Sequence, residues 1–136
     1  KTIRVSVGKA GTETPTGTWT MHRAGRWQEL MGPSWGQYGT HVVNGIFVHS
    51  VACGQANSYN LPVGEYLRLG NPASHGCIRA CVADAKWVWD NCNGSKIRIF
   101  DGTYTSNEAL KGPLGRKALT PLRGSKNFDP TDPACK

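Results

Sequence analysis

The stretch of sequence that decides the fold is residues 38–51, which read YGTHVVNGIFVHSV. Two β-rich runs flank Asn44-Gly45, and this dipeptide between such runs is typical of a β-hairpin with a type I′ turn. The second run places His49 on the returning strand. Because side chains alternate along a strand, His49 shares a face with Phe47, and Ser50 points the other way.

Short alternating runs elsewhere predict a mainly β protein. A half-buried strand is expected over residues 3–7, a second near Trp19 and Met21, and a closing strand over 96–100. Residues 24–37 have no clear period and are expected to form a loop. The 17 glycines and 8 prolines also favour a turn-rich β protein over a helical bundle.

One main helix is expected, over about residues 82–92. Apolar residues recur at helical spacing from Val82 to Trp89, and Asn93-Gly94 follows as a stop signal. The segment before it, residues 53–72, is polar and contains one short helical turn near Glu65. This segment delivers the chain to Ser74 and is long enough to act as a lid.

Composition limits the classes of function. The chain has 136 residues, enough for one domain with a core, and a net charge of +7 from 16 basic and 9 acidic residues. The basic residues are scattered without interleaved aromatics, which argues against nucleic acid as a partner. No apolar run approaches about 18 residues, so no membrane span is expected. The chain starts at Lys1 and not at Met, so it is either a mature protein, from which an export signal could have been removed, or a shortened sequence.

The chemistry is concentrated in residues 74–79, which read SHGCIR. Cys77 is the candidate nucleophile, and His49, on a rigid strand, is the candidate base that accepts its proton. If Ser50 orients the His49 ring, its backbone carbonyl is the expected contact. The N–H groups of His75, Gly76 and Cys77 are candidate donors to an oxyanion, and Arg79 is a candidate ligand for a substrate carboxylate.

A metal site is the competing interpretation of these residues. His49, His75, Cys77 and Cys81 are all ligand types, but their spacing matches no common zinc pattern. A metal would also sequester the nucleophile. We therefore expect neither a metal nor a cofactor.

The five cysteines predict disulfides outside the motif. With Cys77 free, Cys53, Cys81, Cys92 and Cys135 remain. A helix over 82–91 separates Cys81 from Cys92 by about 16 Å, too far for a disulfide, which tolerates about 7 Å between Cα atoms. Two pairings are left: Cys53–Cys81 with Cys92–Cys135, which we favour, or Cys53–Cys92 with Cys81–Cys135. The alternative is five reduced thiols in a reducing compartment.

Three segments resemble the L,D-transpeptidase catalytic domain, the YkuD-like family. Residues 74–79, preceded by His49-Ser50, are similar to its catalytic signature. The run TPTGTW from Thr14 resembles its Thr-Pro-x-Gly-x-aromatic segment, and DAKW from Asp84 resembles the start of its helix after the cysteine. The resemblance covers roughly residues 3–101.

The resemblance implies a β-sandwich and a peptidoglycan L,D-transpeptidase that forms 3→3 cross-links on tetrapeptide stems through a Cys77 thioester. It implies His49 as base, Ser50 as its orienter, His75, Gly76 and Cys77 as oxyanion donors, and Arg79 and Ser74 at the substrate. It also implies peptidoglycan stem peptides as partners, inhibition by carbapenems, and a bacterial cell-wall or secreted location.

The sequence also predicts domain boundaries, and it leaves two alternative functions open. Residues 1–101 are expected to form the catalytic domain, without the family's first hairpin, and residues 102–136 an irregular C-terminal extension packed on it. One alternative is a catalytically silent domain that binds wall or peptide. The other is an L,D-carboxypeptidase in which water replaces the amine acceptor.

Overall fold

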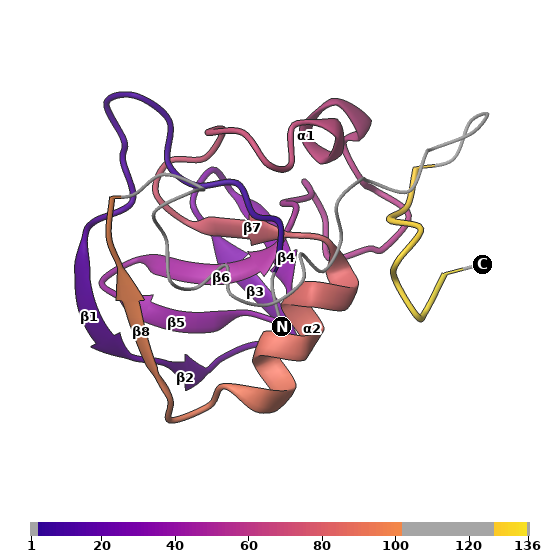
Figure 1. The fold of residues 1–136 in the computed structure, drawn as a ribbon. Helices are drawn as coiled ribbons and strands as arrows, with labels where there is room; N and C mark the ends of the chain where they lie inside the picture. The colour runs from indigo at the N-terminus through magenta and orange to yellow at the C-terminus, as the bar shows by residue number, and fades with distance from the viewer. Residues whose placement is uncertain (1–2, 102–126, 136) are drawn as a thin grey trace.

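The computed structural model describes residues 3–101 and 127–135 and has a mainly β fold (Figure 1). Its elements follow in the order β1 (Gly17–Thr20), β2 (His22–Arg23), β3 (Trp27–Leu30), β4 (Ser34–Gln37), β5 (Thr40–Val43), β6 (Ile46–Ser50), α1 (Val63–Leu67), β7 (Ile78–Ala80), α2 (Val82–Asn91) and β8 (Lys96–Ile99). The strands form a central sheet in the order β2-β5-β6-β7 and two separate pairs, β1-β8 and β3-β4.

The hairpin predicted around Asn44-Gly45 is confirmed as β5 and β6. The two strands pair antiparallel, with Thr40 opposite Val48 and His41 opposite Phe47. The turn departs from type I′, which needs positive φ at both central residues. Asn44 has φ 49°, but Gly45 is not among the described residues with positive φ, and the register shifts between His41 and Val43.

The prediction of a strand over residues 3–7 is wrong, because no continuous strand forms there. The segment is nevertheless bonded to the sheet. It makes isolated bridges, Ser6 with Arg79 and Gly8 with Ser74. Ser6 and Arg79 exchange both backbone hydrogen bonds at 2.8 Å. The chain crosses β7 at one residue and then follows the loop that precedes it, so no continuous ladder forms. β7 therefore has partners on both sides.

The loop predicted over residues 24–37 is wrong, because this segment contains the β3–β4 hairpin. Trp27 pairs with Gln37 and Glu29 with Trp35, so aromatic and polar residues face each other across the strands. Neither strand alternates cleanly between buried and exposed positions, which removes the signal on which strand prediction depends. The hairpin is tied to the chain after β6, where Trp35 and Cys53 exchange backbone hydrogen bonds of 2.8 Å.

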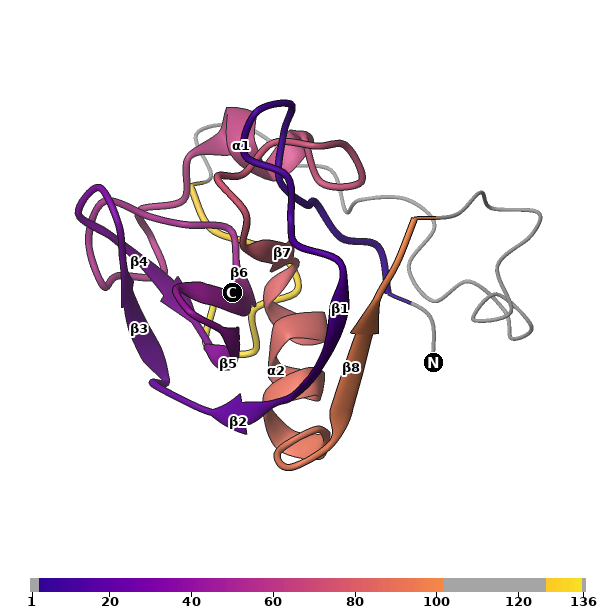
Figure 2. The ribbon, with the colours of Figure 1, turned by 90° about the vertical axis from the view of Figure 1, so that its left-hand side faces the viewer.

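The predicted main helix is confirmed as α2, and the short turn near Glu65 as α1. α2 packs against β4, β6 and β7, with Val82 and Ala85 fully buried (Figure 2). In the same view β1 and the predicted closing strand, β8, run side by side. Within the described residues no helix is long and apolar enough to cross a membrane.

The connection from β6 to β7 is part of the core. Its residues Leu61, Tyr66 and Leu69 are buried in one cluster with Val51 and Cys81. Tyr66, on α1, has no exposed surface at all. A segment anchored in this way is a fixed layer of the fold, which does not fit the lid that its length suggested.

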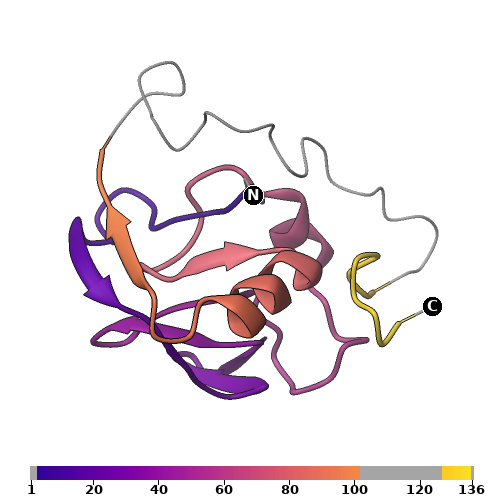
Figure 3. The ribbon, with the colours of Figure 1, turned by 60° about the horizontal axis from the view of Figure 1, so that its bottom comes forward.

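The C-terminal residues 127–135 are irregular and pack on the same body, near the start of α2 (Figure 3). The backbone N–H of Leu61 donates to the carbonyl of Asn127 at 2.9 Å, and Phe128 is 9% exposed. The rest of the predicted extension, residues 102–126, lies outside the described residues. The predicted boundary at residue 101 stays a prediction.

All five cysteines are free thiols, so neither predicted pair of disulfides is present. Cys53 and Cys81 are buried in one cluster, but each sulfur has another partner: the Val51 carbonyl at 3.6 Å and Asp84 Oδ2 at 3.2 Å, respectively. Burial, with the charges of Asp129 and Asp132, raises the pKa of Cys53 to about 11. This thiol is therefore unreactive in the folded protein.

Candidate active site

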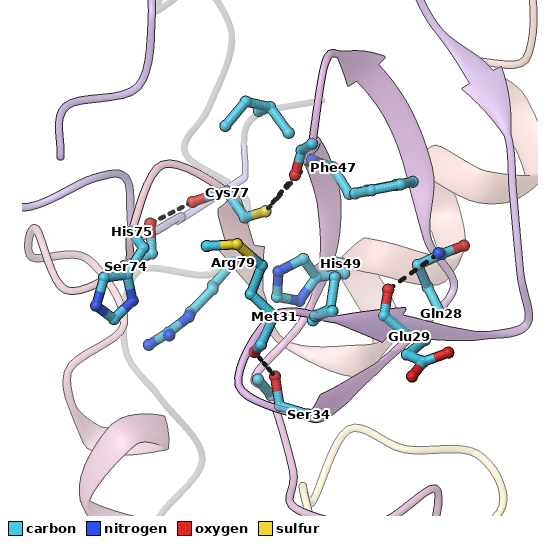
Figure 4. Close-up of a pocket in the computed structure, with 14 residues that line it drawn as sticks. Gln28, Glu29, Met31, Ser34, Phe47, His49, Ser74, His75, Cys77 and Arg79 are labelled. Carbon is cyan, nitrogen blue, oxygen red and sulfur yellow. Dashed lines mark hydrogen bonds between the residues drawn. The ribbon is translucent and has the colours of Figure 1, made fainter.

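A cavity of about 600 Å³ collects most of the predicted site residues (Figure 4). Its wall comes from the β3–β4 hairpin, from the β5–β6 hairpin and from residues 74–79. Of the predicted residues it is lined by His49, Ser74, His75, Cys77 and Arg79. Ser50 and Gly76 lie beside it in the chain and contact its residues.

Parallel pairing of β6 with β7 places the thiol and the imidazole in the wall of one cavity. His49 lies opposite Arg79, and Val48 lies opposite Ile78. Cys77 immediately precedes β7, next to Phe47. Since side chains alternate along both strands, Cys77 and His49 project from the same face into the cavity.

The Cys77 thiol is held at the edge of β6. The backbone N–H of Phe47 donates to its Sγ at 3.4 Å, and the Gly45 carbonyl lies 3.5 Å from the same sulfur. Burial raises the pKa of this thiol above its ordinary value, and the Phe47 N–H and the Arg79 charge only partly oppose that effect. The resting group is a neutral thiol, which needs a base in order to attack.

His49 lines the same cavity and is the predicted acceptor for that proton. Its side chain is 1% exposed, and its Nδ1 is hydrogen-bonded to the Ser50 carbonyl, the contact predicted from the sequence. A carbonyl only accepts, so Nδ1 carries the hydrogen and Nε2 has the free lone pair. Burial lowers the pKa of His49 to about 4, the Arg79 charge adds to this, and the Ser50 hydrogen bond opposes it. The ring is therefore neutral at pH 7.

Gly36 on β4 is a site residue that sequence reasoning missed. A Cβ built on Gly36 would lie 2.7 Å from His49 Nδ1 and 2.9 Å from its Cγ. The imidazole thus lies directly against the backbone of β4. A glycine inside a strand can mark such a close approach, but residues 24–37 gave no strand pattern in which to place it.

The loop before Cys77 is closed by Ser74. Its hydroxyl donates to the Cys77 carbonyl at 2.6 Å and accepts from the Gly76 N–H at 3.1 Å. Gly76 has φ 130°, and a Cβ there would lie 2.7 Å from Ile46 Cδ1. Ser74 thus holds the turn that presents the thiol. Its predicted contact with substrate stays a prediction.

The segment around Thr14 holds this loop from outside. The Thr14 hydroxyl donates to the Gly76 carbonyl at 2.7 Å and accepts from the Gly8 N–H at 2.9 Å. The Thr12 hydroxyl donates to the Ser74 carbonyl at 3.0 Å. These bonds give the TPTGTW segment a physical role, since its first threonine joins the N-terminal chain to the nucleophile loop.

Arg79 lies at the cavity wall with its side chain 14% exposed, and its Nη1 pairs with Glu65 Oε2 at 2.8 Å. Its buried Nε has no hydrogen-bond partner. One edge of the guanidinium is thus held by α1. Among residues 3–101 and 127–135, no three His, Cys, Asp or Glu side chains are grouped to hold a metal ion.

A thiol and a buried imidazole that line one cavity are the components of a cysteine nucleophile site, the class of site that forms covalent intermediates with its substrate. The family model of the L,D-transpeptidase catalytic domain, YkuD, matches residues 1–117. The chain belongs to this family.

Individual relatives agree with this assignment. YciB of Bacillus subtilis, which is named as an L,D-transpeptidase, is 59% identical over 27 residues, 20% of this chain and 14% of YciB. A solved Clostridium acetobutylicum protein, titled as a fused Zn-dependent amidase, peptidase and peptidoglycan-binding protein, is 26% identical with a TM-score of 0.51, over 71% of this chain and 38% of its own. An L,D-transpeptidase of Mycobacterium tuberculosis shares the fold at 23% identity with a TM-score of 0.57, over 73% of this chain and 42% of its own. The chain thus spans less than half the length of each.

Proposed function

We propose that this protein is a peptidoglycan L,D-transpeptidase that works through a thioester on Cys77. The observation that carries the proposal is that Cys77 and His49 line one cavity, with the His49 ring held through Nδ1 by the Ser50 carbonyl. This arrangement leaves Nε2 as the proton acceptor. Membership of the L,D-transpeptidase family supports a peptidoglycan substrate, and the donor that we propose is a tetrapeptide stem.

In the first half-reaction the Cys77 sulfur attacks the carbonyl carbon of the third stem residue, and His49 Nε2 takes the thiol proton. The tetrahedral intermediate then loses the terminal D-alanine as its C–N bond breaks. The imidazolium returns the proton to the leaving amine. The product is a thioester between Cys77 and the shortened stem, together with free D-alanine.

In the second half-reaction the side-chain amine of a diamino acid on another stem attacks the thioester carbonyl. His49 accepts a proton from this amine, the C–S bond breaks, and the sulfur leaves and is reprotonated. The new amide is a 3→3 cross-link. Water in place of the amine would give a tripeptide by hydrolysis, which is the carboxypeptidase alternative.

The residues around the dyad support this chemistry. The Gly76 N–H is engaged by the Ser74 hydroxyl, which leaves the N–H groups of His75 and Cys77 as the candidate oxyanion donors. Arg79 contributes positive charge at the cavity wall, where a stem carboxylate would bind. Gly76 keeps the approach to the sulfur free of a side chain.

The test is product analysis with purified tetrapeptide stems. Release of D-alanine with a cross-linked dimer supports the proposal, whereas a tripeptide without dimer would assign the carboxypeptidase reaction. We expect Cys77→Ser and His49→Gln to lower turnover at least about 10²-fold, as expected for loss of a nucleophile or a general base. A folded wild-type protein that turns over no stem would overturn the proposal in favour of a silent binding domain.

We extend the proposal to carbapenem inhibition and to a cell-wall location outside the cytoplasm. Solved L,D-transpeptidases include a complex with imipenem and a faropenem-derived adduct. A Cys77 thiol in an open cavity is suited to the same acylation. The net charge of +7 suits a surrounding of wall polyanions. Fractionation of cells with an antibody against the chain would test the location.

A further inference from the structure

The C-terminal segment buries two carboxylates that the mechanism above does not use. Asp129 is 2% exposed and Asp132 is 3% exposed. Buried carboxylates are costly unless hydrogen-bonded, so the partners of such groups indicate what the segment does. The two aspartates have different hydrogen-bond partners. Only the partners of Asp132 are connected to a residue that lines the cavity.

Asp132 fixes the side chain of Gln37, which is itself only 3% exposed at the end of β4. The Gln37 Nε2 donates to Asp132 Oδ2 at 2.9 Å. Its Oε1 accepts from Arg26 Nη1 at 2.9 Å. A carboxylate on one side and a guanidinium on the other leave the amide a single orientation.

Gln37 in turn is bonded to the residue that orients His49. Its backbone N–H donates to the Ser50 hydroxyl at 2.8 Å. The Ser50 carbonyl accepts from His49 Nδ1. The neighbouring Gly36 is the residue whose backbone lies against the His49 ring. Gly36 thus lies against the ring, and Gln37 is bonded to the residue that carries the hydrogen-bond acceptor of the ring.

We propose that Asp132 is a positioning residue of the active site, holding His49 in place through Gln37 and Ser50. The inference rests on the proposed role of His49 as base. It assigns residues 127–135 a function in catalysis although they lie outside the cavity. It also accounts for a carboxylate buried against a glutamine 95 positions away in the chain.

Asp129 provides the contrast, because its partners belong to α2. Its Oδ2 accepts from the Val82 N–H at 2.8 Å, and its Oδ1 accepts from the N–H and hydroxyl of Thr131 at 2.7 Å. The Thr131 hydroxyl accepts from the Ala83 N–H at 3.1 Å. Asp129 therefore caps the start of the helix, where a carboxylate also complements the helix dipole.

The charged groups around His49 determine how the loss of Asp132 changes the pKa of His49. Cys77 and Arg79 line the cavity with His49, and Glu65 pairs with Arg79. Arg26 and Asp132 act from the other side through Gln37. The Ser50 hydrogen bond raises the pKa of His49 against the effect of burial, so a looser Ser50 contact disfavours the imidazolium and lowers that pKa.

The experiment compares Asp132→Asn with Asp129→Asn in the full chain. ¹⁵N NMR of the histidine rings reports the tautomer and pKa of His49, and stopped-flow fluorescence with imipenem reports acylation. For Asp132→Asn we expect a disturbed Nδ1–H signal, a lower pKa for His49, and an acylation rate lower on the order of tenfold at saturating imipenem, since small displacements of a catalytic group cost that much or more. For Asp129→Asn we expect a lower melting temperature, with wild-type His49 signals and rate.

A folded Asp132→Asn protein with wild-type His49 signals and wild-type acylation rate would overturn the inference. If this variant fails to fold, Gln37→Met removes the same link but keeps the backbone N–H that Ser50 needs, and the same changes are expected. Absence of acylation in the wild-type protein would count against the proposed function. The NMR comparison would still test the Asp132 link in that case.

Discussion

At the scale of single residues, the site is a neutral thiol beside a neutral imidazole. Burial disfavours the charged form of both groups: it raises the pKa of Cys77 and lowers that of His49 to about 4. In the proposed mechanism, attack by Cys77 therefore requires transfer of its proton during the reaction, because the raised pKa disfavours a thiolate at rest. In such a site the orientation of the His49 ring matters more than a change in the pKa of either group.

The first prediction concerns alkylation of Cys77. Because its pKa lies above the ordinary 9.0, iodoacetamide should modify Cys77 slowly at pH 7, and the rate should still be rising above pH 9. Peptide mapping against Cys77→Ser measures the rate at this residue alone. A rate that levels off below pH 8 would instead indicate a thiolate stabilised at rest.

The second prediction concerns stability and pH. His49 has a folded pKa of about 4 against 6.5 unfolded, so the unfolded chain binds more protons between these values. Stability should be full above pH 6.5, fall as the pH drops toward 4, and lose about 3 kcal/mol over that range from this group. Urea unfolding of wild type and His49→Gln should differ by this slope. Equal pH dependence in wild type and His49→Gln would contradict burial of a neutral His49. The control is His75→Gln, which replaces an exposed histidine.

The third prediction concerns Gly36. In Gly36→Ala the new methyl group would lie 2.7 Å from His49 Nδ1, so the ring must move. We expect turnover or acylation to fall about 10²-fold, with the fold retained. Gly64→Ala adds a methyl group in open space on α1 and should keep wild-type rates. Normal activity in a folded Gly36→Ala protein would show that the ring position is not critical.

Sequence reasoning reached the residues with distinctive chemistry and missed those that support them. The SHGCIR motif and the Asn-Gly hairpin were sufficient to predict Cys77, His49 and the Ser50 carbonyl contact. Gly36 acts through its backbone, and Gln37 through its side-chain amide and its backbone N–H. Neither residue type indicates such a role in the sequence. Asp132 was missed because its partner is 95 positions away and its own segment looks like surface chain.

At the scale of helices and strands, the site depends on segments that hold one another in place through backbone hydrogen bonds. β7 is short, yet it is paired with β6 on one side and bridged by Ser6 on the other. The β3–β4 hairpin is fixed by backbone bonds between Trp35 and Cys53. Periodicity predicted α2 and β8, and the Asn-Gly turn between β-rich runs predicted β5 and β6. β3 and β4 do not alternate between buried and exposed positions and gave no signal.

The fourth prediction tests one such set of hydrogen bonds, those of Thr14. Thr14→Val removes the hydrogen bonds to Gly8 and Gly76 while keeping the side-chain shape. At about 0.5–1.5 kcal/mol per bond, unfolding free energy should fall by about 1–3 kcal/mol, and the amide of Gly8 should exchange faster with solvent. Thr18→Val, at an exposed position on β1, should leave both unchanged. Unaltered exchange in Thr14→Val would show that the loop is held by other contacts.

At the scale of the whole molecule, both ends of the described chain contact residues next to the candidate active site. The N-terminal segment holds the nucleophile loop through Thr14, and residues 127–135 reach the base through Gln37. The domain is thus assembled from distant parts of the sequence. Such long-range contacts, unlike hairpins and helix periods, leave no local pattern from which to predict them.

The most direct test of the central claim, that Cys77 is the acylated nucleophile, is intact-protein mass spectrometry after exposure to imipenem. All five cysteines are free thiols, so the experiment asks which one reacts. We expect a single adduct, mapped by peptide sequencing to Cys77, present in Cys92→Ser and absent in Cys77→Ser. An adduct that persists in Cys77→Ser, or a folded wild-type protein without any adduct, would contradict the account.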